Sequence, residues 1–237
     1  MTVESQLAAL GGRYGLPAEA TDRLRSLLRI LTEDPLAPTA VHDPAKAIDD
    51  HLADSLVALE VAQIRDAGTI ADLGSGAGVP GLPLAIAMPG TLFSLVESSA
   101  RKCDFIRRAV GACELRNVEV VSSRIEQWSA QVDVVTARAL APLEVVVEYA
   151  APLLLVGGSL AAWRGQRDPA AESAATKAAQ IVGIQPGEIR PVKPYPAARN
   201  RYLHLMSKVM ETPDRFPRRP GIALKRPLGS EATSSDR

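Results

Sequence analysis

One stretch decides the fold of this chain: Thr69-Ile-Ala-Asp-Leu-Gly-Ser-Gly-Ala-Gly-Val-Pro-Gly81. It begins with strand character, reaches an acid at Asp72, and continues with glycines at alternate positions, Gly74, Gly76 and Gly78. Glycine lets the backbone turn tightly and lets a ligand approach where a Cβ would clash. Pro80 suits the first position of a helix, where its missing N–H costs nothing. A strand, a tight loop and a helix in this order predict a ligand site at the carboxyl end of a strand.

Short apolar runs of strand length continue beyond this stretch, and helical segments separate them. The strand candidates are 69–73, 92–96, 118–121, 132–136, 159–163 and 202–207, and the helix candidates are 81–88, 100–113, 142–154 and 169–182. Short strands that alternate with helices pair in parallel and form a doubly wound sheet with helices on both faces. The sequence therefore predicts an α/β fold with a mostly parallel, Rossmann-like sheet over residues 66–210.

The first 65 residues are predicted to form a helical extension that packs on this core. Apolar residues recur there at helical spacing in two stripes, Leu24, Leu27, Leu28 and Leu31 in the first and Ile48, Leu52, Leu56 and Leu59 in the second. A proline-containing loop at 36–44 separates the two stripes. His51 lies on the second stripe, so we expect it to be packed and hydrogen-bonded rather than catalytic.

Charge is distributed unevenly along a chain whose formal net charge is zero. Ten basic residues and only two acids lie between Arg190 and Arg226. Proline and charge together predict that residues 211–237 form an extended, partly disordered basic tail, with disorder over 229–237. Such a tail can bind backbone phosphates without reading sequence. The alternative is a solvated tail that only keeps the protein soluble.

Composition argues against several classes of protein. The two cysteines, Cys103 and Cys113, match neither a metal-ligand spacing nor a disulfide framework, and the three histidines are widely spaced, so we expect no metal site. We recognise no signal peptide and no apolar run long enough to span a bilayer. We therefore expect a cytoplasmic protein that does not bind membranes.

Two cofactors compete for the glycine loop. The run from Gly76 to Gly81 matches the G-x-G-x-x-G pattern of NAD(P)-binding oxidoreductases, and Glu97 lies at the expected distance. Against this alternative, the strand ends before Gly74 rather than before Gly76, and Asp72 would repel a pyrophosphate. No downstream residue is an obvious acid for hydride transfer.

S-adenosylmethionine fits these residues better, because it has no phosphate, carries an ammonium and a sulfonium, and has two free ribose hydroxyls. Asp72 can face its positive end, and Glu97 can accept both ribose hydroxyls. In the other reading of Glu97, it pairs with Arg101 or Lys102 in the next helix.

An ordered set of motifs resembles the glucose-inhibited division protein B family. The set consists of 72–81, Leu95-Val-Glu-Ser98, Arg101-Lys-Cys-Asp-Phe105, Ser123-Arg-Ile-Glu126, Thr136-Ala-Arg-Ala-Leu140 and a closing motif at 217–228. Asp43-Pro44, His51 and Asp54-Ser55 resemble the motif that precedes the sheet. The resemblance implies a 16S ribosomal RNA methyltransferase that uses S-adenosylmethionine and modifies guanine at N7.

The resemblance also implies roles for individual residues. It implies cofactor contacts at Gly74, Val79, Ile125, Glu126 and Arg138, beside Asp72, Gly76, Gly78 and Glu97 from the loop geometry. Arg138 follows the fourth strand, where it could hold the methionine carboxylate or a base edge and so position the reactants, or serve only as a surface ion-pair partner. Candidate RNA contacts are Arg164, Arg201, Arg218, Arg219, Lys225 and Arg226.

Two positions depart from the family pattern: Ala37-Pro38-Thr39 replaces the usual Asn-Leu-Thr, and Arg164-Gly165 replaces a Lys-Gly pair. Both bear on RNA contact rather than on the cofactor.

Methylation at guanine N7 uses a ring lone pair, so no general base is expected. The partner implied is 16S ribosomal RNA or the small ribosomal subunit, bound by a monomer. A non-catalytic RNA-binding protein on the same scaffold is the remaining alternative.

Overall fold

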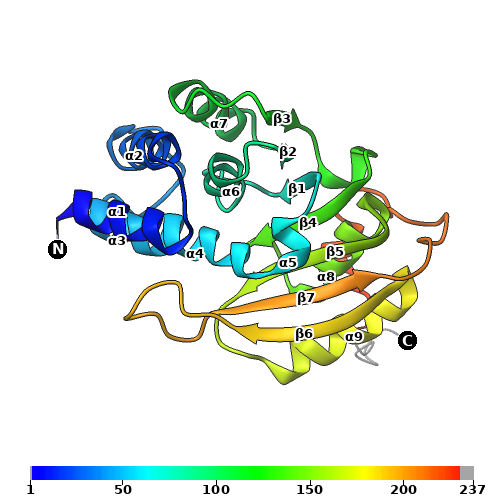
Figure 1. Cartoon of the computed structure of the whole chain (residues 1–237). Coiled ribbons are helices and arrows are strands. Elements are labelled where there is room, and N and C mark those ends of the chain that lie inside the picture. The colour runs from blue at the N-terminus through cyan, green and yellow to red at the C-terminus, as the bar shows by residue number, and fades with distance from the viewer. Residues whose placement is uncertain (1, 230–237) are drawn as a thin grey trace.

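The computed structural model describes residues 2–229, which form a seven-stranded sheet with helices on both faces (Figure 1). The strands are β1 (Thr69–Leu73), β2 (Leu92–Glu97), β3 (Val118–Ser122), β4 (Val132–Arg138), β5 (Leu154–Arg164), β6 (Ile184–Pro191) and β7 (Tyr202–Lys208). Their order is β3-β2-β1-β4-β5-β7-β6, and β7 alone runs antiparallel to both of its neighbours. The predicted α/β class and mostly parallel sheet are confirmed.

Each predicted strand is present, and the differences have local causes. β5 starts at Leu154, earlier than expected, and its pairing with β4 shifts between Val132 and Val134. β6 was not predicted, because Pro186 and Pro191 interrupt its pattern. β6 is the outermost strand, and an edge strand tolerates residues that cannot donate to a ladder.

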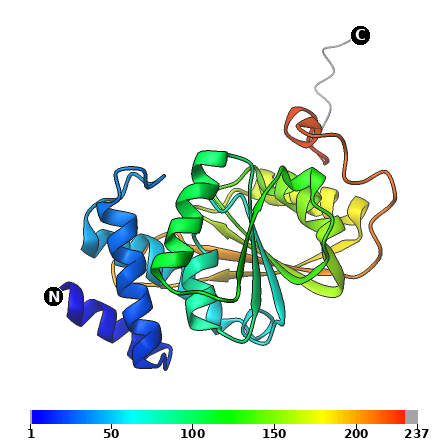
Figure 2. The same cartoon turned by 90° about the horizontal axis from the view of Figure 1, so that it is seen from above.

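Helices divide between the two faces of the sheet, as Figure 2 shows. α6 (Gly81–Ala87) and α7 (Ala100–Ala112) belong to one apolar cluster with Ile70 and Phe93, whereas α8 (Leu143–Ala150) and α9 (Pro169–Val182) belong to another with Ala71 and Val135. Alternate residues of a strand point to opposite faces, so neighbours such as Ile70 and Ala71 serve different clusters. The sheet is therefore covered on both faces, as its apolar strands require.

The N-terminal segment packs on the α6 and α7 side of the sheet. It contains α1 (Val3–Arg13), α2 (Ala18–Glu33), α3 (Pro44–Ala47), a π-helical turn (Ile48–Ala53), α4 (Asp54–Leu56), a 3-10 turn (Val57–Glu60) and α5 (Ala62–Arg65). The predicted leucine stripe of α2 is buried. The π-helical turn is a further departure from a regular helix, and such turns are frequent at functional sites.

The C-terminal segment corrects one expectation. After β7 it crosses to the α8 side of the sheet and ends in α10 (Ile222–Lys225), which packs on α8 (Figure 2). Phe216 and Ala223 are buried there. The prediction of an extended surface arm is therefore wrong for residues 211–229, because these two apolar residues anchor the chain between its prolines. The disorder expected over 229–237 lies, apart from Gly229, outside the described residues.

No helix between residues 2 and 229 is both long and apolar enough to cross a membrane.

Candidate cofactor site and an adjoining cavity

The glycine loop bends sharply between β1 and α6. Gly74, Gly76 and Gly78 all have positive φ, at +66°, +58° and +79°. At Gly74 a Cβ would lie 2.4 Å from the Cδ1 of Leu140, so a side chain here would have to displace Leu140 and would be strained by the positive φ. The amides of Gly74 and Ser75 donate to the carbonyl of Val96, at 2.8 and 3.2 Å, which holds the loop against β2.

Asp72 lies behind this loop and does not reach a ligand cavity. It is buried, accepts a hydrogen bond from the Thr136 hydroxyl at 2.9 Å, and accepts another from the Gly81 amide at 3.3 Å. Burial raises its pKa to about 6, although these hydrogen bonds act in the opposite direction. Asp72 therefore ties β1 to β4 and to the start of α6, and its predicted contact with the positive end of the cofactor stays a prediction.

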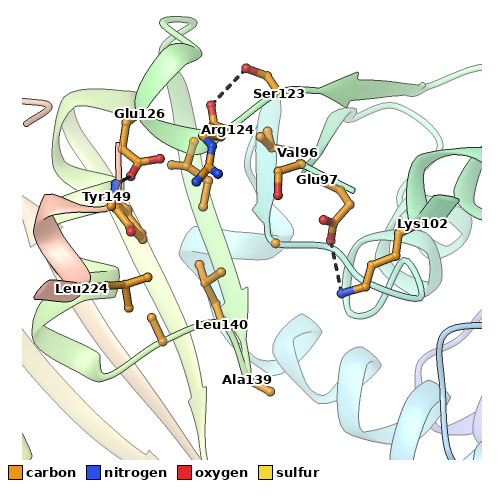
Figure 3. Close-up of a pocket in the computed structure, with 15 residues that line it drawn as sticks. Val96, Glu97, Lys102, Ser123, Arg124, Glu126, Ala139, Leu140, Tyr149 and Leu224 are labelled. Atoms are coloured by element: carbon orange, nitrogen blue, oxygen red, sulfur yellow. Dashed lines mark hydrogen bonds and ion pairs between the residues drawn. The ribbon is translucent and has the colours of Figure 1, made fainter. Parts of the chain in front are cut away.

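A cavity of about 300 Å³ opens in front of the loop, and we call it the Glu97 cavity (Figure 3). Four of the predicted cofactor residues line it: Gly74, Glu97, Ile125 and Glu126. Asp72, Gly76, Gly78, Val79 and Arg138 are not among its lining residues. The cavity lies at the carboxyl ends of β1, β2 and β4, where parallel sheets of this kind bind ligands.

The carboxylate of Glu97 is held firmly at the tip of β2. Its Oε1 accepts from the Ser99 amide at 2.8 Å, and its Oε2 accepts from the Gly76 amide at 3.2 Å. The Lys102 ammonium lies 3.9 Å from Oε2, which is too far for a hydrogen bond (Figure 3). The alternative pairing with Lys102 is therefore present only as a loose ion pair. Since each oxygen can accept more than one hydrogen bond, the carboxylate can still receive a ligand's hydroxyls.

The C-terminal segment forms one wall of the Glu97 cavity. The Gly221 amide donates to the Oε1 of Glu126 at 2.8 Å, and Leu224 of α10 lines the cavity although its side chain is 55% exposed. Sequence reasoning assigned this segment to RNA alone. The closing motif at 217–228, which contains Gly221 and Leu224, is the sequence feature that could have indicated a role for this segment at the cavity.

Arg218 anchors the same segment through a buried ion pair. Its guanidinium bonds to both oxygens of Glu148, which is only 2% exposed on α8. It also donates to the carbonyl of Arg226 at 2.9 Å. The structure therefore pairs the charge of Arg218 within the fold, and its predicted contact with RNA stays a prediction. Arg219, Lys225 and Arg226 keep exposed side chains.

Arg138 is also paired, and its partners belong to the N-terminal segment. Its guanidinium donates to the Oδ2 of Asp54 at 2.9 Å and to the carbonyl of Asp50 at 2.7 Å. It lies 3.2 Å from the Nδ1 of His51. Burial and the Arg138 charge lower the pKa of His51 to about 4, so the ring is neutral near pH 7. The Nε2 of His51 lies 2.8 Å from the Thr39 hydroxyl. Arg138 is thus neither a surface ion-pair partner nor a free ligand for the cofactor.

A second cavity, of about 430 Å³, adjoins the first at Ala139, and we call it the Asp54 cavity. It lies where β4 and β5 end, and its walls include Asp50, Asp54, Arg138, Trp163, Arg164 and Arg201. The predicted RNA contacts Arg164 and Arg201 therefore meet in one cavity. Asp50 and Asp54 were not predicted as site residues, although Asp54 belongs to a quoted motif.

The comparisons with known proteins agree with this geometry. The family model described as rRNA small subunit methyltransferase G matches residues 31–195. A protein of that name from Chloroflexus aggregans is 42% identical over 84% of this chain and 85% of its own length. Another from Carboxydothermus hydrogenoformans is 34% identical over 95% of this chain and all of its own length.

Solved structures share the fold at low identity. The mitomycin 7-O-methyltransferase MmcR superposes with a TM-score of 0.58 at 14% identity, over 86% of this chain and 72% of that one. A SAM-dependent O-methyltransferase from Thermotoga maritima gives 0.55 at 19% identity, over 78% and 72%. Fibrillarin from Aeropyrum pernix, solved with S-adenosyl-L-methionine bound, gives 0.52 at 18% identity, over 65% and 72%. On the sequence matches, with the fold in agreement, the chain belongs to the ribosomal RNA small subunit methyltransferase G family.

Proposed function

We propose that this protein transfers a methyl group from S-adenosylmethionine to N7 of a guanine in 16S ribosomal RNA, acting as a monomer in the cytoplasm. Its family makes it an S-adenosylmethionine-dependent methyltransferase with an RNA substrate. What we propose beyond the family is the identity of the methylated base and atom, and the roles of individual residues. The observation that carries it is the pair of adjoining cavities at the carboxyl end of the sheet, one for the methyl donor and one for the acceptor.

The cofactor occupies the Glu97 cavity in this proposal. Glu97 accepts the two ribose hydroxyls, because its oxygens are oriented by the amides of Gly76 and Ser99. Ile125 and Leu224 offer apolar surface to the adenine, since both line the same cavity. The other predicted residues of the loop, Asp72, Gly76, Gly78 and Val79, shape it from behind.

Arg138 acts as a positioning residue rather than as a ligand of the methionine carboxylate. It lines the Asp54 cavity next to Ala139, the residue that both cavities share, and binds Asp54 and the Asp50 carbonyl. Methyl transfer requires donor and acceptor in line at close range, and correct positioning can supply up to roughly 7–11 kcal/mol of the barrier. By fixing the N-terminal segment to the end of β4, Arg138 keeps the two cavities at a constant position relative to each other.

The transfer needs no general base. The N7 lone pair of guanine attacks the methyl carbon, the bond from that carbon to sulfur breaks, and its electron pair stays on sulfur. The positive charge passes from the sulfonium to the methylated base, and no proton leaves at this step. Exposed cations on α10 and beside it, Arg219, Lys225 and Arg226, suit the phosphates of the RNA backbone.

The experiment that tests the proposal analyses the methylated nucleoside. Small subunits or 16S RNA from cells that lack this methylation are incubated with the protein and methyl-labelled S-adenosylmethionine, and the RNA is digested to nucleosides. We expect all of the label in 7-methylguanosine. Label in another nucleoside would overturn the assignment of base and atom, and an absence of label from both substrates would overturn the activity.

A further inference from the structure

We propose that the Asp54 cavity holds the target guanine by its Watson–Crick edge, with the carboxylate of Asp54 and the guanidinium of Arg201 as the groups that distinguish guanine from other bases. This inference rests on the proposed function. It adds which residues recognise the base, and it can fail while that function stands.

The position of the cavity suits an acceptor base. Ala139 lines both cavities, so a base in one lies next to a cofactor in the other. The volume of about 430 Å³ lies within the range of small-molecule sites, about 300–1,000 Å³. A base must leave its stack to enter such a cavity, as enzymes that modify bases commonly require.

Asp54 carries an acceptor that the folded chain leaves open. Its side chain is 7% exposed, and its Oδ2 accepts from Arg138. Its Oδ1 is buried and has no hydrogen bond within residues 2–229. The Nε of Arg201 lies 3.4 Å from that oxygen and forms an ion pair with it, without hydrogen-bond geometry. Buried polar atoms are nearly always hydrogen-bonded, so a buried carboxylate oxygen without a partner, on a residue that lines a cavity, indicates a missing donor.

The residue cannot turn this oxygen elsewhere. The indole Nε1 of Trp163 donates to the backbone carbonyl of Asp54 at 2.7 Å, and Arg138 holds the other carboxylate oxygen. Desolvation by burial raises the pKa of Asp54, and the neighbouring Arg138 acts in the opposite direction. A hydrogen-bond donor supplied by a ligand would stabilise the charged form in the same way as Arg138 does.

Guanine is the base whose edge matches a carboxylate beside a guanidinium. Its N1–H and 2-amino group are adjacent donors, and its O6 next to them is an acceptor. Adenine offers an acceptor at N1 and a donor at its 6-amino group, so Asp54 would repel its N1. Arg201 contacts Asp50 and Tyr195 only at 3.3–3.4 Å, which leaves its N–H groups able to turn to O6. N7 belongs to the Hoogsteen edge and makes none of these Watson–Crick contacts, so this orientation leaves N7 free to react.

Asp50 provides a matched control, because it lines the same cavity with its oxygens already occupied. Its Oδ1 accepts from the Tyr195 hydroxyl at 2.8 Å and its Oδ2 from the Lys46 ammonium at 2.6 Å. Both Asp50 and Asp54 are acids beside Arg201, but only Asp54 has an open, buried oxygen. A recognition role therefore predicts different behaviour for Asp54→Asn and Asp50→Asn.

The experiment compares methyl transfer to guanosine and to inosine, which keeps N1–H, O6 and N7 but lacks the 2-amino group. RNA is assembled with either nucleoside at the target position, once that position has been mapped by its 7-methylguanosine. For the wild type we expect kcat/KM to be at least about tenfold higher with guanosine, the discrimination expected from the loss of one hydrogen bond to a charged acceptor. In Asp54→Asn this ratio should fall close to one, and in Asp50→Asn it should persist.

Two measurements keep the result interpretable. S-adenosylmethionine affinity, measured by calorimetry, should be the same in both variants as in the wild type, which shows that the Glu97 cavity is intact. Should Asp54→Asn fail to fold, the wild-type ratio alone decides, because equal rates with guanosine and inosine would overturn the proposal. An Asp54→Asn enzyme that still discriminates would overturn it as well, with the N7 activity unaffected.

Discussion

The Glu97 cavity and the Asp54 cavity share Ala139 but are built differently. The first consists mostly of residues that follow strand ends in chain order, and the C-terminal segment adds one wall. The second draws on the N-terminal segment, the ends of β4 and β5, and residues 192–202. The two ends of the chain thus lie on opposite sides of the sheet and each completes one cavity (Figure 2).

Each end is fastened by an arginine, and the two ion pairs differ in one respect. Arg218 bonds to both oxygens of Glu148, so neither carboxylate oxygen lacks a hydrogen bond. Arg138 bonds to a single oxygen of Asp54 and leaves the other without a hydrogen bond. An ion pair that uses both carboxylate oxygens serves to hold the chain. Where one carboxylate oxygen beside a cavity has no hydrogen bond, a ligand can supply the donor. Three predictions test the C-terminal segment and the Glu97 cavity against the Asp54 cavity.

The largest effect is expected for Arg218→Ala. The change leaves Glu148 as an uncompensated charge at 2% exposure, so the free energy of unfolding should fall by about 3–5 kcal/mol. Denaturant unfolding measures it. The neighbouring Arg219→Ala is the control, and it should change stability by less than about 0.5 kcal/mol because its side chain is exposed. Equal stability of the two variants would mean that the C-terminal segment is not held by this pair.

A smaller effect, confined to the cofactor, is expected for Glu97→Gln. Loss of a charged acceptor should weaken S-adenosylmethionine binding by about 1.5–3 kcal/mol, or roughly 10- to 100-fold. Titration calorimetry measures the affinity. The preference for guanosine over inosine should persist, because Asp54 is unchanged.

Glu119→Gln is the matched control, since Glu119 lies exposed on the adjacent strand β3 and does not line the Glu97 cavity. If both variants bind the cofactor as the wild type does, Glu97 does not hold the ribose.

The smallest effect is expected for Leu224→Ala. Its side chain is 55% exposed but lines the Glu97 cavity, so a bound adenine would cover part of it. Loss of that contact should weaken S-adenosylmethionine binding by about 1 kcal/mol, or roughly fivefold. The control is Leu92→Ala, which removes another exposed leucine, 62% exposed at the start of β2 and outside the cavity. Identical cofactor affinity in both variants would exclude the C-terminal segment from the cofactor site.

The order of residue types along the chain was enough to predict the sheet and part of the candidate cofactor site. Alternation of short apolar strands and helices predicted the parallel strands, and the glycine loop with Glu97 predicted the edge of the sheet at which the Glu97 cavity opens. These features depend on backbone geometry over a few residues, which is visible in the order of residue types. β6 escaped prediction because its prolines are acceptable only at a sheet edge, and edge position is not a local property.

The sequence by itself determined the fold class, the family and the glycine loop beside the Glu97 cavity. Only the tertiary structure decided which charges are free. Arg138 and Arg218 both looked available, yet their partners Asp54 and Glu148 lie 84 and 70 positions away in the chain. Pairing of a charge depends on distance and burial after folding, and residue type alone contains neither. For the same reason, the open oxygen of Asp54 became visible only when the N-terminal segment met the end of β4.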